Sequence, residues 1–496
     1  MSLVLAIDQS TSATKALLFT AEGRVVDQES AEHRQVYPQP GWVEHDAEEI
    51  WRNLMSVLRT LLRRQADRKG EITALSLTNQ RETIALFERG TGRPLHPAMV
   101  WQCRRGADLC AVHAAAGHGP LVHRKTGLPL DPYFSASKLQ HLLRAEPALR
   151  AKLTDGSALI GTIDAYLIHR LTGGRVFACD ATNASRTLLY DITRLDWDDE
   201  LCALWEVPRR ALPEVRASDA AFGETTLEGL LPAPLPIRGV MGDSQAALFA
   251  QRGFAPGAAK VTFGTGSSIL LNIGPAPRFP SEGVATALAW QLGAQPTYAF
   301  EGIIISAAST LTWLRDQLGF VHDIAEFETL ASAVPDNGGV YLVPAFSGLG
   351  LPHWAPAARA ALLGLGTQSD RRHVARAALE SIPLQIRDAL ESLRSGAGVN
   401  VGEIHADGGP TANRLLMQLT ADLTGATLRV ATMPHCSPLG AAFAGMLGTG
   451  HYRLLEVISA LPREETVYRP AMSATTSARL IGGWQGAIRS VLGGTR

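Results

Sequence analysis

Short apolar runs, each closed by a small or hydroxylated turn, recur along the chain and predict buried β-strands. The first run, Leu3 to Ile7, enters the polar segment Asp8 to Thr14 and returns as a second apolar segment, which predicts a hairpin with a hydroxyl-rich tip. The pattern recurs in the second half, where residues 258–263 and 267–273 flank Gly264-Thr265-Gly266. A strand–tip–strand unit at the start of each half indicates a duplicated fold. Further strands are predicted at residues 15–20, 24–29, 72–77, 83–87, 236–241, 284–290, 297–300 and 340–343.

Between these strands, apolar residues recur at helical spacing. Residues 46–64 predict an amphipathic helix that opens with an acidic first turn. Residues 158–238 are predicted to be mainly helical, with Pro-rich connections. Strands alternating with helices predict an α/β protein. The other helices are predicted over residues 304–318, 371–393 (with Pro383 inside), 414–423, 436–447 and 473–496.

One carboxylate stands at the turn between a central strand and a helix. Residues 236–241 predict the strand, Gly242 the turn, and Asp243-Ser244 the N-cap of a helix that contains residues 246–250. The positive end of a helix dipole favours an ionised carboxylate. Asp243 is therefore placed to take a proton from a hydroxyl group, although a simple N-cap role is the alternative.

The two hairpin tips are candidate phosphate cradles, because small residues leave backbone N–H groups free to bind an anion. The spacing is not that of a Walker loop, and a polar hairpin turn is the alternative. Asp8, at the end of the first strand, suits a magnesium ion that keeps its water shell. Asp407-Gly408-Gly409-Pro410 adds a third turn, where backbone and a helix N-terminus are open to a planar or anionic ligand.

Charged and aromatic residues in three other turns could grip a small polyol. Arg81 and Glu82 lie between two predicted strands, and Trp101 and Tyr133 lie in later connections. Charged groups bind hydroxyls and a ring covers the carbon edge. Each residue could instead be part of a surface turn or the core, and spacing alone does not decide.

Composition narrows the class of protein. A chain of 496 residues is too long for one core, so two large domains are expected. The net charge of −1 argues against nucleic acid as a partner, and no apolar run reaches the roughly 18 residues of a membrane span. Cys103, Cys110, Cys179, Cys202 and Cys436 form no C-x-x-C pair, so we expect reduced, buried thiols and a cytoplasmic location.

Several motifs, in this order, make the chain resemble the FGGY carbohydrate kinases, and among them the glycerol kinases, over essentially its whole length. They are Pro40-Gly-Trp-Val-Glu-His-Asp46, Thr78-Asn-Gln-Arg-Glu-Thr83, Trp101-Gln-Cys-Arg-Arg105, Asp131-Pro-Tyr-Phe-Ser135, Thr182-Asn-Ala-Ser-Arg-Thr187, Gly242-Asp243 with Gln245-Ala-Ala-Leu-Phe249, and Asp407-Gly-Gly409 with Asn413. The resemblance implies two ribonuclease-H-like domains of the actin and sugar-kinase superfamily around an interdomain cleft. We expect them at residues 1–247, with the polyol site and first phosphate hairpin, and 248–496, with the nucleotide site.

The resemblance also implies roles for individual residues. Asp243 matches the catalytic base, and Asp8 the carboxylate near Mg²⁺. Residues that match the polyol site are Arg81, Glu82, Trp101, Tyr133, Asp243, Ser244 and Gln245. Residues that match the ATP site are Thr11, Ser12, Ala13, Lys15, Gly264, Thr265, Gly266, Ala308, Gly409 and Asn413.

The implied reaction is transfer of a phosphoryl group from MgATP to a primary hydroxyl of a small polyol, and glycerol is the first candidate substrate. Ser244 stands where the glycerol kinases usually have Gln, Ser268 where they have Phe, and Lys15 where they have Arg. The two serines enlarge and polarise the site, which keeps open a larger polyol or ketose such as erythritol, xylitol or xylulose. A non-enzymatic sensor on the same fold is a third hypothesis. We expect a homo-oligomer, dimer or tetramer.

Overall fold

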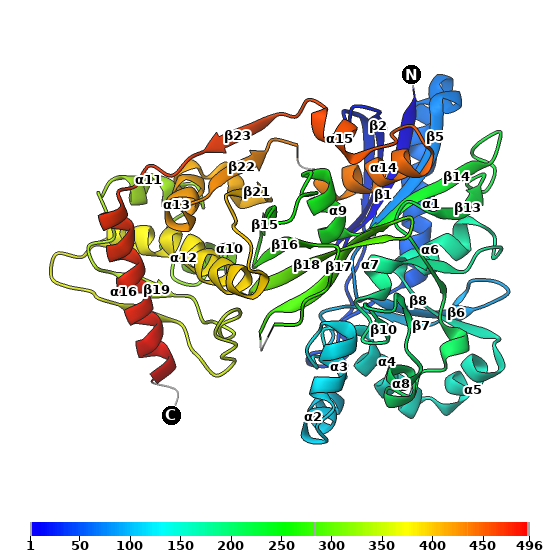
Figure 1. Cartoon of the computed structure of the whole chain (residues 1–496), viewed down its shortest axis with the longest axis horizontal. Coiled ribbons are helices and arrows are strands. Elements are labelled where there is room, and N and C mark those ends of the chain that lie inside the picture. The colour runs from blue at the N-terminus through cyan, green and yellow to red at the C-terminus, as the bar shows by residue number, and fades with distance from the viewer. Residues whose placement is uncertain (1, 281–282, 434, 494–496) are drawn as a thin grey trace.

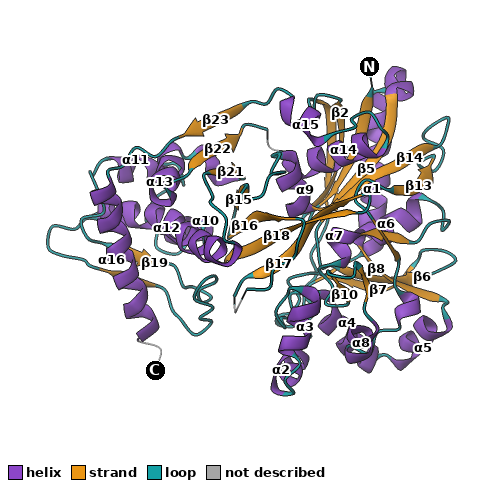
Figure 2. Ribbon diagram, viewed as in Figure 1, coloured by secondary structure: helices purple, strands orange, loops and turns teal. Residues whose placement is uncertain are grey.

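Two mixed β-sheets organise the chain, and six of the seven strands of the second, read from β18 to β23, repeat the order of the first read from β3 to β13. The computed structural model describes residues 2–280, 283–433 and 435–493 and forms two lobes (Figures 1 and 2). The first sheet has the order β13-β14-β5-β1-β2-β3 and the second β17-β18-β16-β15-β21-β22-β23. In each, an antiparallel hairpin (β1–β2, β15–β16) is continued on one side by parallel strands (β5 and β14, β21 and β22). The shared order confirms the predicted α/β fold with two related domains.

The strands of the first sheet are β1 (Leu3–Gln9), β2 (Ala13–Thr20), β3 (Val25–Glu32), β5 (Ile72–Asn79), β13 (Ala221–Thr225) and β14 (Leu235–Gly242). Those of the second are β15 (Ala259–Phe263), β16 (Ser267–Gly274), β17 (Ala285–Leu292), β18 (Gln295–Ile304), β21 (Glu403–Asp407), β22 (Thr427–Ala431) and β23 (Glu465–Tyr468).

Helix α1 (Ala47–Arg64) covers one face of the first sheet, as its sequence pattern predicts. The Asp46 side chain accepts a hydrogen bond from the Glu48 amide and caps the helix. Ile50, Leu54 and Leu58 recur at helical spacing on its buried face and pack in the core with the apolar residues of β1 and β5. This burial fixes the sheet whose edge carries the candidate site.

A smaller sheet in the first lobe has the order β4-β7-β6-β8 and carries Trp101 and Tyr133 on its connections. Figure 2 shows it with its helices at the lower right. Its strands are β4 (Glu44–His45), β6 (Ile84–Glu88), β7 (Pro94–Met99) and β8 (Ala158–Thr162). The helices of this part are α2 (Ala107–Ala115), α3 (Gly119–Thr126), α4 (Ser135–Ala145), α5 (Pro147–Asp155), α6 (Ile163–Leu171), α7 (Ala181–Ala184) and α8 (Asp199–Leu204).

The second lobe is built on the long, mostly buried helix α12 (Arg371–Ala397), which runs through Pro383. Its other helices are α10 (Ala308–Asp316), α11 (Glu326–Ser332), α13 (Arg414–Thr424) and α16 (Ala474–Gly493), and a small sheet pairs β19 (Tyr341–Val343) with β20 (Ala361–Leu363). Helix α15 (Leu455–Ala460) lies near β2 in Figure 1, and its Ile458 belongs to the same core as Val4 and Phe19 of the first sheet. No described helix is long and apolar enough to cross a membrane.

Two helices connect the lobes: α9 (Asp243–Ala250) and α14 (Cys436–Gly448). They pack so closely that a Cβ added at Gly440 would lie 1.8 Å from the Ala246 carbonyl oxygen, so this position requires glycine. Although α14 comes late in the chain, it lies beside β1 and β2 of the first lobe in Figure 1, and its Phe443 packs with Val4 and Phe19. The division at residues 247/248 falls within α9 and stays a prediction.

Several local predictions are wrong. Residues 158–238 are not mainly helical: besides β8 and β13 they contain the short strands β9 (Ala178–Asp180), β10 (Tyr190–Asp191), β11 (Asp196–Trp197) and β12 (Glu214–Arg216). The helix predicted from residue 304 begins at Ala308, because β18 extends to Ile304. The C-terminal helix begins at Ala474, and residues 494–496 of its predicted range lie outside the described residues. All five cysteines lie in the described part of the chain and are free and buried, as predicted.

Candidate active site

The candidate site lies where three parallel strands of the first sheet end side by side. Gln9 of β1 pairs with Asn79 of β5, and Asn79 pairs with Gly242 of β14. Since the carboxyl ends of neighbouring parallel strands meet at one edge, the residues that follow them are brought together. Asp8, the segment from Gln80 to Thr83, and Asp243 all reach this edge although they are far apart in sequence.

Asp243 is the first residue of α9, not its N-cap as predicted. Gly242 takes the N-cap position with extended backbone (φ −62°, ψ 147°), so the helix starts one residue earlier. The Asp243 Oδ1 atom accepts a hydrogen bond from the Ser244 amide at 2.7 Å and lies 3.2 Å from Arg81 Nε. Its side chain is 38% exposed while that of Arg81 is 6% exposed. The carboxylate is thus held by a buried cation and open to a substrate.

Arg81 and Glu82 are fixed by buried partners. Glu82 has φ 61°, a left-handed conformation that is unfavourable for a residue with a side chain, and Arg186 Nε donates to its Oε1 atom at 2.5 Å. Arg81 Nη1 donates to Gln245 Oε1 at 3.3 Å, and the Gln245 amide nitrogen donates to the Leu288 carbonyl at 3.3 Å. Gln245, predicted to bind the polyol, is buried behind Arg81 and contacts it directly.

Trp101 and Tyr133 form an aromatic pair beside these charges. Their ring centroids are 5.5 Å apart with planes at 59°. Burial raises the pKa of Tyr133, and the carboxylate of Glu82 adds to this effect, so its hydroxyl stays protonated. Trp101 Nε1 donates to Thr11 Oγ1 at 3.0 Å, which links the aromatic pair to the first hairpin tip.

The buried ammonium of Lys138 lies behind this aromatic pair. Its Nζ atom donates to the backbone carbonyls of Tyr133 at 2.6 Å, Pro132 at 2.8 Å and Trp101 at 3.4 Å. Burial lowers the pKa of Lys138 to about 8. Lys138 therefore joins the two segments that carry the rings.

At the first hairpin, Asp8 and Lys15 are paired residues of β1 and β2, with Lys15 Nζ 3.9 Å from Asp8 Oδ2. Burial raises the pKa of Asp8 to about 6; Lys15 opposes this rise and the nearby negative charge of Asp243 adds to it. Thr11 is half-buried, Ser12 is exposed, and Ala13 is buried as the first residue of β2. Thr11 and Ser12 at the tip are thus open to a ligand, with Lys15 beside them.

The second hairpin tip caps helix α10. The backbone amide of Ala308 donates to the Gly264 carbonyl at 3.1 Å, and Ala307 and Ser309 donate to that of Thr265. Gly266 has no room for a side chain, because an added Cβ would lie 2.4 Å from the Ile304 carbonyl oxygen. The three tip residues and Ala308 therefore form one unit.

The glycine turn after β21 lies next to this unit, because Asp407 pairs with Thr262 of β15. Gly408 has φ 104°, and an added Cβ would lie 1.9 Å from the Phe263 carbonyl oxygen, whereas Gly409 faces open space. Asn413 caps α13 by accepting a hydrogen bond from the Leu416 amide at 2.8 Å. Gly409 and Asn413 thus lie near the second tip.

Three buried residues of this site were not predicted as site residues: Lys138, Arg186 and Glu301. Lys138 and Glu301 lie in segments that read as ordinary helix and strand. Arg186 belongs to a motif that carried the resemblance, but no local pattern shows which carboxylates it contacts.

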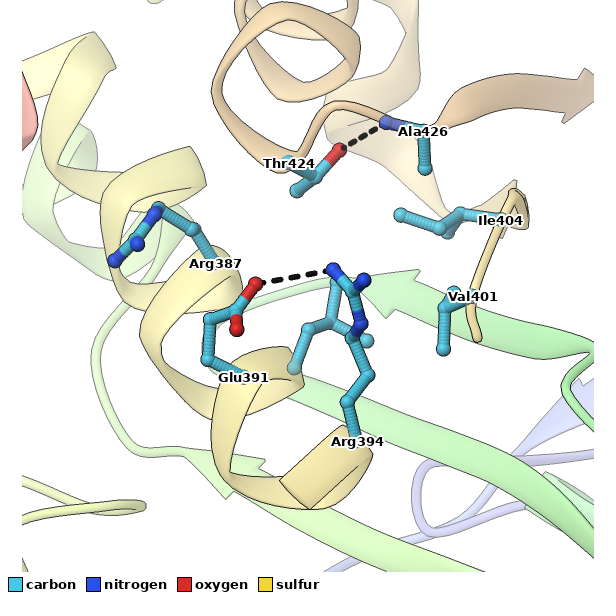
Figure 3. Close-up of a pocket in the computed structure, with 8 residues that line it drawn as sticks. Arg387, Glu391, Arg394, Val401, Ile404, Thr424 and Ala426 are labelled. Carbon is cyan, nitrogen blue, oxygen red and sulfur yellow. Dashed lines mark hydrogen bonds and ion pairs between the residues drawn. The ribbon is translucent and has the colours of Figure 1, made fainter. Parts of the chain in front are cut away.

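A separate hollow on the second lobe contains none of the predicted residues (Figure 3). It lies between α12 and the α13–β22 connection. Its Arg394 pairs with Glu391 at 3.0 Å and also donates to Asn400 at 3.1 Å, so this guanidinium is already occupied. This hollow is therefore not part of the candidate site at the ends of β1, β5 and β14.

Sequence profiles of the FGGY family of carbohydrate kinases match most of the chain: the N-terminal domain at residues 3–250 and the C-terminal domain at residues 259–449. The chain belongs to this family. An FGGY kinase is a phosphotransferase, so the sequence-based resemblance is confirmed and the hypothesis of a non-enzymatic sensor is set aside.

Similar proteins extend this finding. Glycerol kinase 1 of Thermotoga maritima is 45% identical over 489 residues, with 99% of each chain covered. Glycerol kinase of Thermus brockianus is 45% identical over 493 residues, again with 99% of each covered. The structure of Plasmodium falciparum glycerol kinase with ADP superposes with a TM-score of 0.94 at 33% identity, covering 99% of this chain and 98% of that one.

Proposed function

We propose that this protein transfers a phosphoryl group from ATP to a primary hydroxyl of glycerol, giving glycerol 3-phosphate. The observation that carries the proposal is the exposed Asp243 carboxylate, ion-paired to buried Arg81 beside the Trp101–Tyr133 ring pair. The full-length similarity to glycerol kinases of Thermotoga maritima and Thermus brockianus supports glycerol as the polyol.

In this proposal Asp243 accepts the hydroxyl proton, which makes the hydroxyl oxygen a better nucleophile. Arg81 and Glu82 bind the other hydroxyls by charge-assisted hydrogen bonds, and the rings of Trp101 and Tyr133 cover the carbon edge. Ser244 follows Asp243 on the same helix turn. The protein mainly positions the reactants and neutralises charge, as phosphoryl transfer requires.

Residues of both hairpins serve the nucleotide. Thr11, Ser12, Ala13 and Lys15 hold phosphate from the first lobe, and the Gly264–Gly266 tip holds it from the second. Ala308, Gly409 and Asn413 line the adenosine side. Closure of the lobes would exclude water and prevent hydrolysis of ATP.

Asp8 fits a magnesium ion. Burial and the nearby charge of Asp243 raise its pKa to about 6, so a bound divalent cation would relieve an unfavourable negative charge there. Mg²⁺ keeps several waters and binds phosphate oxygens, so one or two carboxylates are enough to hold it. When bound, Mg²⁺ neutralises the phosphate charge.

A larger polyol or ketose is the second candidate. Ser268 on β16 has a buried hydroxyl with no hydrogen-bond partner among the described residues, so a further substrate hydroxyl could satisfy it. The variant Ser268→Phe should then lose kcat/KM for C4 and C5 substrates while keeping that for glycerol.

The proposal is tested by coupled ADP release over a panel of C3 to C6 polyols and ketoses. Glycerol should give the highest kcat/KM, and a pentitol or pentulose at least tenfold ahead of glycerol would replace it with the second candidate. We also propose a cytoplasmic location, because buried free thiols are typical of proteins in a reducing compartment. We further propose that the protein is a homo-oligomer, which light scattering would measure.

A further inference from the structure

A chain of five charged side chains runs through the site and crosses from one lobe to the other. Arg81 lies between two carboxylates: its Nε is 3.2 Å from Asp243 and its Nη1 is 3.0 Å from Glu301 Oε1. Arg186 also lies between two: its Nη1 is 2.5 Å from Glu301 Oε2 and its Nε is 2.5 Å from Glu82. Glu301 is thus shared by both arginines.

Glu301 comes from the second lobe, whereas the other four residues belong to the first lobe or to α9. It lies on β18, paired with Leu270 of β16 and Ala285 of β17. The β17–β18 hairpin is fastened to the first lobe: the Thr286 amide donates to the Gly127 carbonyl at 2.8 Å, and the Tyr298 hydroxyl donates to the Ile192 carbonyl at 2.7 Å. The second lobe therefore delivers this carboxylate to the polyol side of the site.

The four inner side chains are almost completely buried, with Arg186 0% and Glu301 1% exposed. Two cations face the two anions Glu82 and Glu301, so these charges balance, and Asp243 at the exposed end is the remaining charge. Burial alone would raise the pKa of Glu301, but Arg186 and Arg81 lower it to about 2, so it is ionised at every relevant pH.

Glu301 contacts both arginines at hydrogen-bond distance: its Oε1 lies 3.0 Å from Arg81 Nη1 and its Oε2 lies 2.5 Å from Arg186 Nη1. An amide of the same shape keeps the volume of the side chain, but it is neutral and turns an N–H donor toward a guanidinium that also only donates. Replacing Glu301 by Gln therefore removes the charge that holds the two arginines.

We propose that Glu301 is a positioning residue for the polyol site: it fixes Arg81 and Arg186 so that Asp243 and Glu82 face the substrate. The inference rests on the proposed function, because Arg81, Glu82 and Asp243 are the groups it orients. Because Glu301 comes from the second lobe, the geometry of the polyol site depends on how the two lobes are arranged: a movement of β18 against the first lobe would shift both arginines together.

The test compares Glu301→Gln with a matched control, Glu380→Gln. Glu380 lies on α12 of the same lobe, is 1% exposed, and pairs with Arg376 at 2.6 Å within its own helix. We expect Glu301→Gln to lower kcat/KM for the polyol by about 10- to 100-fold, with KM for ATP changed less than about twofold. Glu380→Gln should change both parameters less than about twofold, whatever its loss of thermal stability.

Glu301→Gln with wild-type polyol kinetics would overturn the inference, as would an equal kinetic loss in Glu380→Gln. If Glu301→Gln does not fold, Arg186→Lys is the second variant. Its ammonium can contact only one of the two carboxylates that Arg186 joins, so the polyol KM should rise at least fivefold. An unchanged polyol KM would refute the inference. Failure of the proposed function is distinguishable, because then the wild-type protein itself would not prefer glycerol in the panel of C3 to C6 polyols and ketoses.

Discussion

Replacing the buried lysine behind the aromatic pair by Met should weaken substrate binding in a protein that still folds. Lys138→Met keeps the length of the side chain and removes its charge. In the folded protein the Lys138 ammonium donates to the carbonyls of Tyr133, Pro132 and Trp101, two of them within 2.8 Å. These carbonyls fix the segments that carry both rings.

The two contributions to stability that change in Lys138→Met partly cancel. A lysine whose pKa falls from 10.5 to about 8 on folding costs about 3 kcal/mol at neutral pH, a cost that Met removes. The two short hydrogen bonds to a charged donor contribute about 3 to 6 kcal/mol, which Met loses. The free energy of unfolding should therefore fall by at most about 3 kcal/mol.

The pH dependence of this balance has a definite sign. Because the folded pKa of Lys138 lies below its unfolded value, the unfolded chain binds the extra proton between about pH 8 and 10.5. The contribution of Lys138 to stability should therefore rise with pH across that window. Denaturant unfolding of both proteins at pH 7, 8, 9 and 10 would show this rise in wild type only.

Binding should respond strongly to the same change. With the ring segments released, we expect the polyol KM of Lys138→Met to rise at least tenfold, about 1.4 kcal/mol, and KM for ATP to stay within twofold. The control is Lys125→Met, which removes the ion pairs of Lys125 with Asp198 and Glu200 in the same lobe. Equal effects of both variants on the polyol KM, or none in Lys138→Met, would refute the reasoning.

Two further variants test other contacts. Asp8→Asn should abolish Mg²⁺-dependent turnover yet raise the free energy of unfolding at pH 7 by up to about 3 kcal/mol, because a buried aspartate with a pKa of about 6 destabilises the folded state as pH rises from about 4 to 6. Steady-state kinetics and denaturant titration measure the two effects, and a variant that is destabilised and active would contradict this prediction. Thr11→Val removes the acceptor of the Trp101 indole N–H, so the polyol KM should rise roughly fivefold, about 1 kcal/mol, and an unchanged KM would show that the contact is not needed.

Sequence pattern predicted most of the scaffold of the site. The run from Leu3 to Ile7 is continuous and apolar because both faces of this central strand are buried, and Asp46 marks the start of α1. Predictions failed where elements are short or boundaries ambiguous. Strands of two to three residues, such as Tyr190–Asp191, carry no periodicity, and Ile303-Ile304 suits β18 as well as a helix.

The candidate site was predictable only in part. Turn residues at strand ends gave Asp8, Asp243 and the hairpin tips, and family resemblance added roles for Trp101 and Tyr133. Glu301 is 115 residues from Arg186 in the sequence and pairs with it only through the tertiary fold, so no local signal marks it. Ion pairs between buried residues that are distant in sequence can be identified only in the three-dimensional structure.

The account depends most on Asp243 as the base, and one measurement tests it directly: single-turnover phosphorylation of glycerol by Asp243→Asn, with ADP binding and thermal unfolding measured on the same preparation. The substitution keeps the shape of the side chain and removes its capacity to accept a proton. We predict wild-type folding and ADP affinity with a rate at least about 100-fold lower. A rate within a few-fold of wild type would contradict the assignment of Asp243 as the catalytic base.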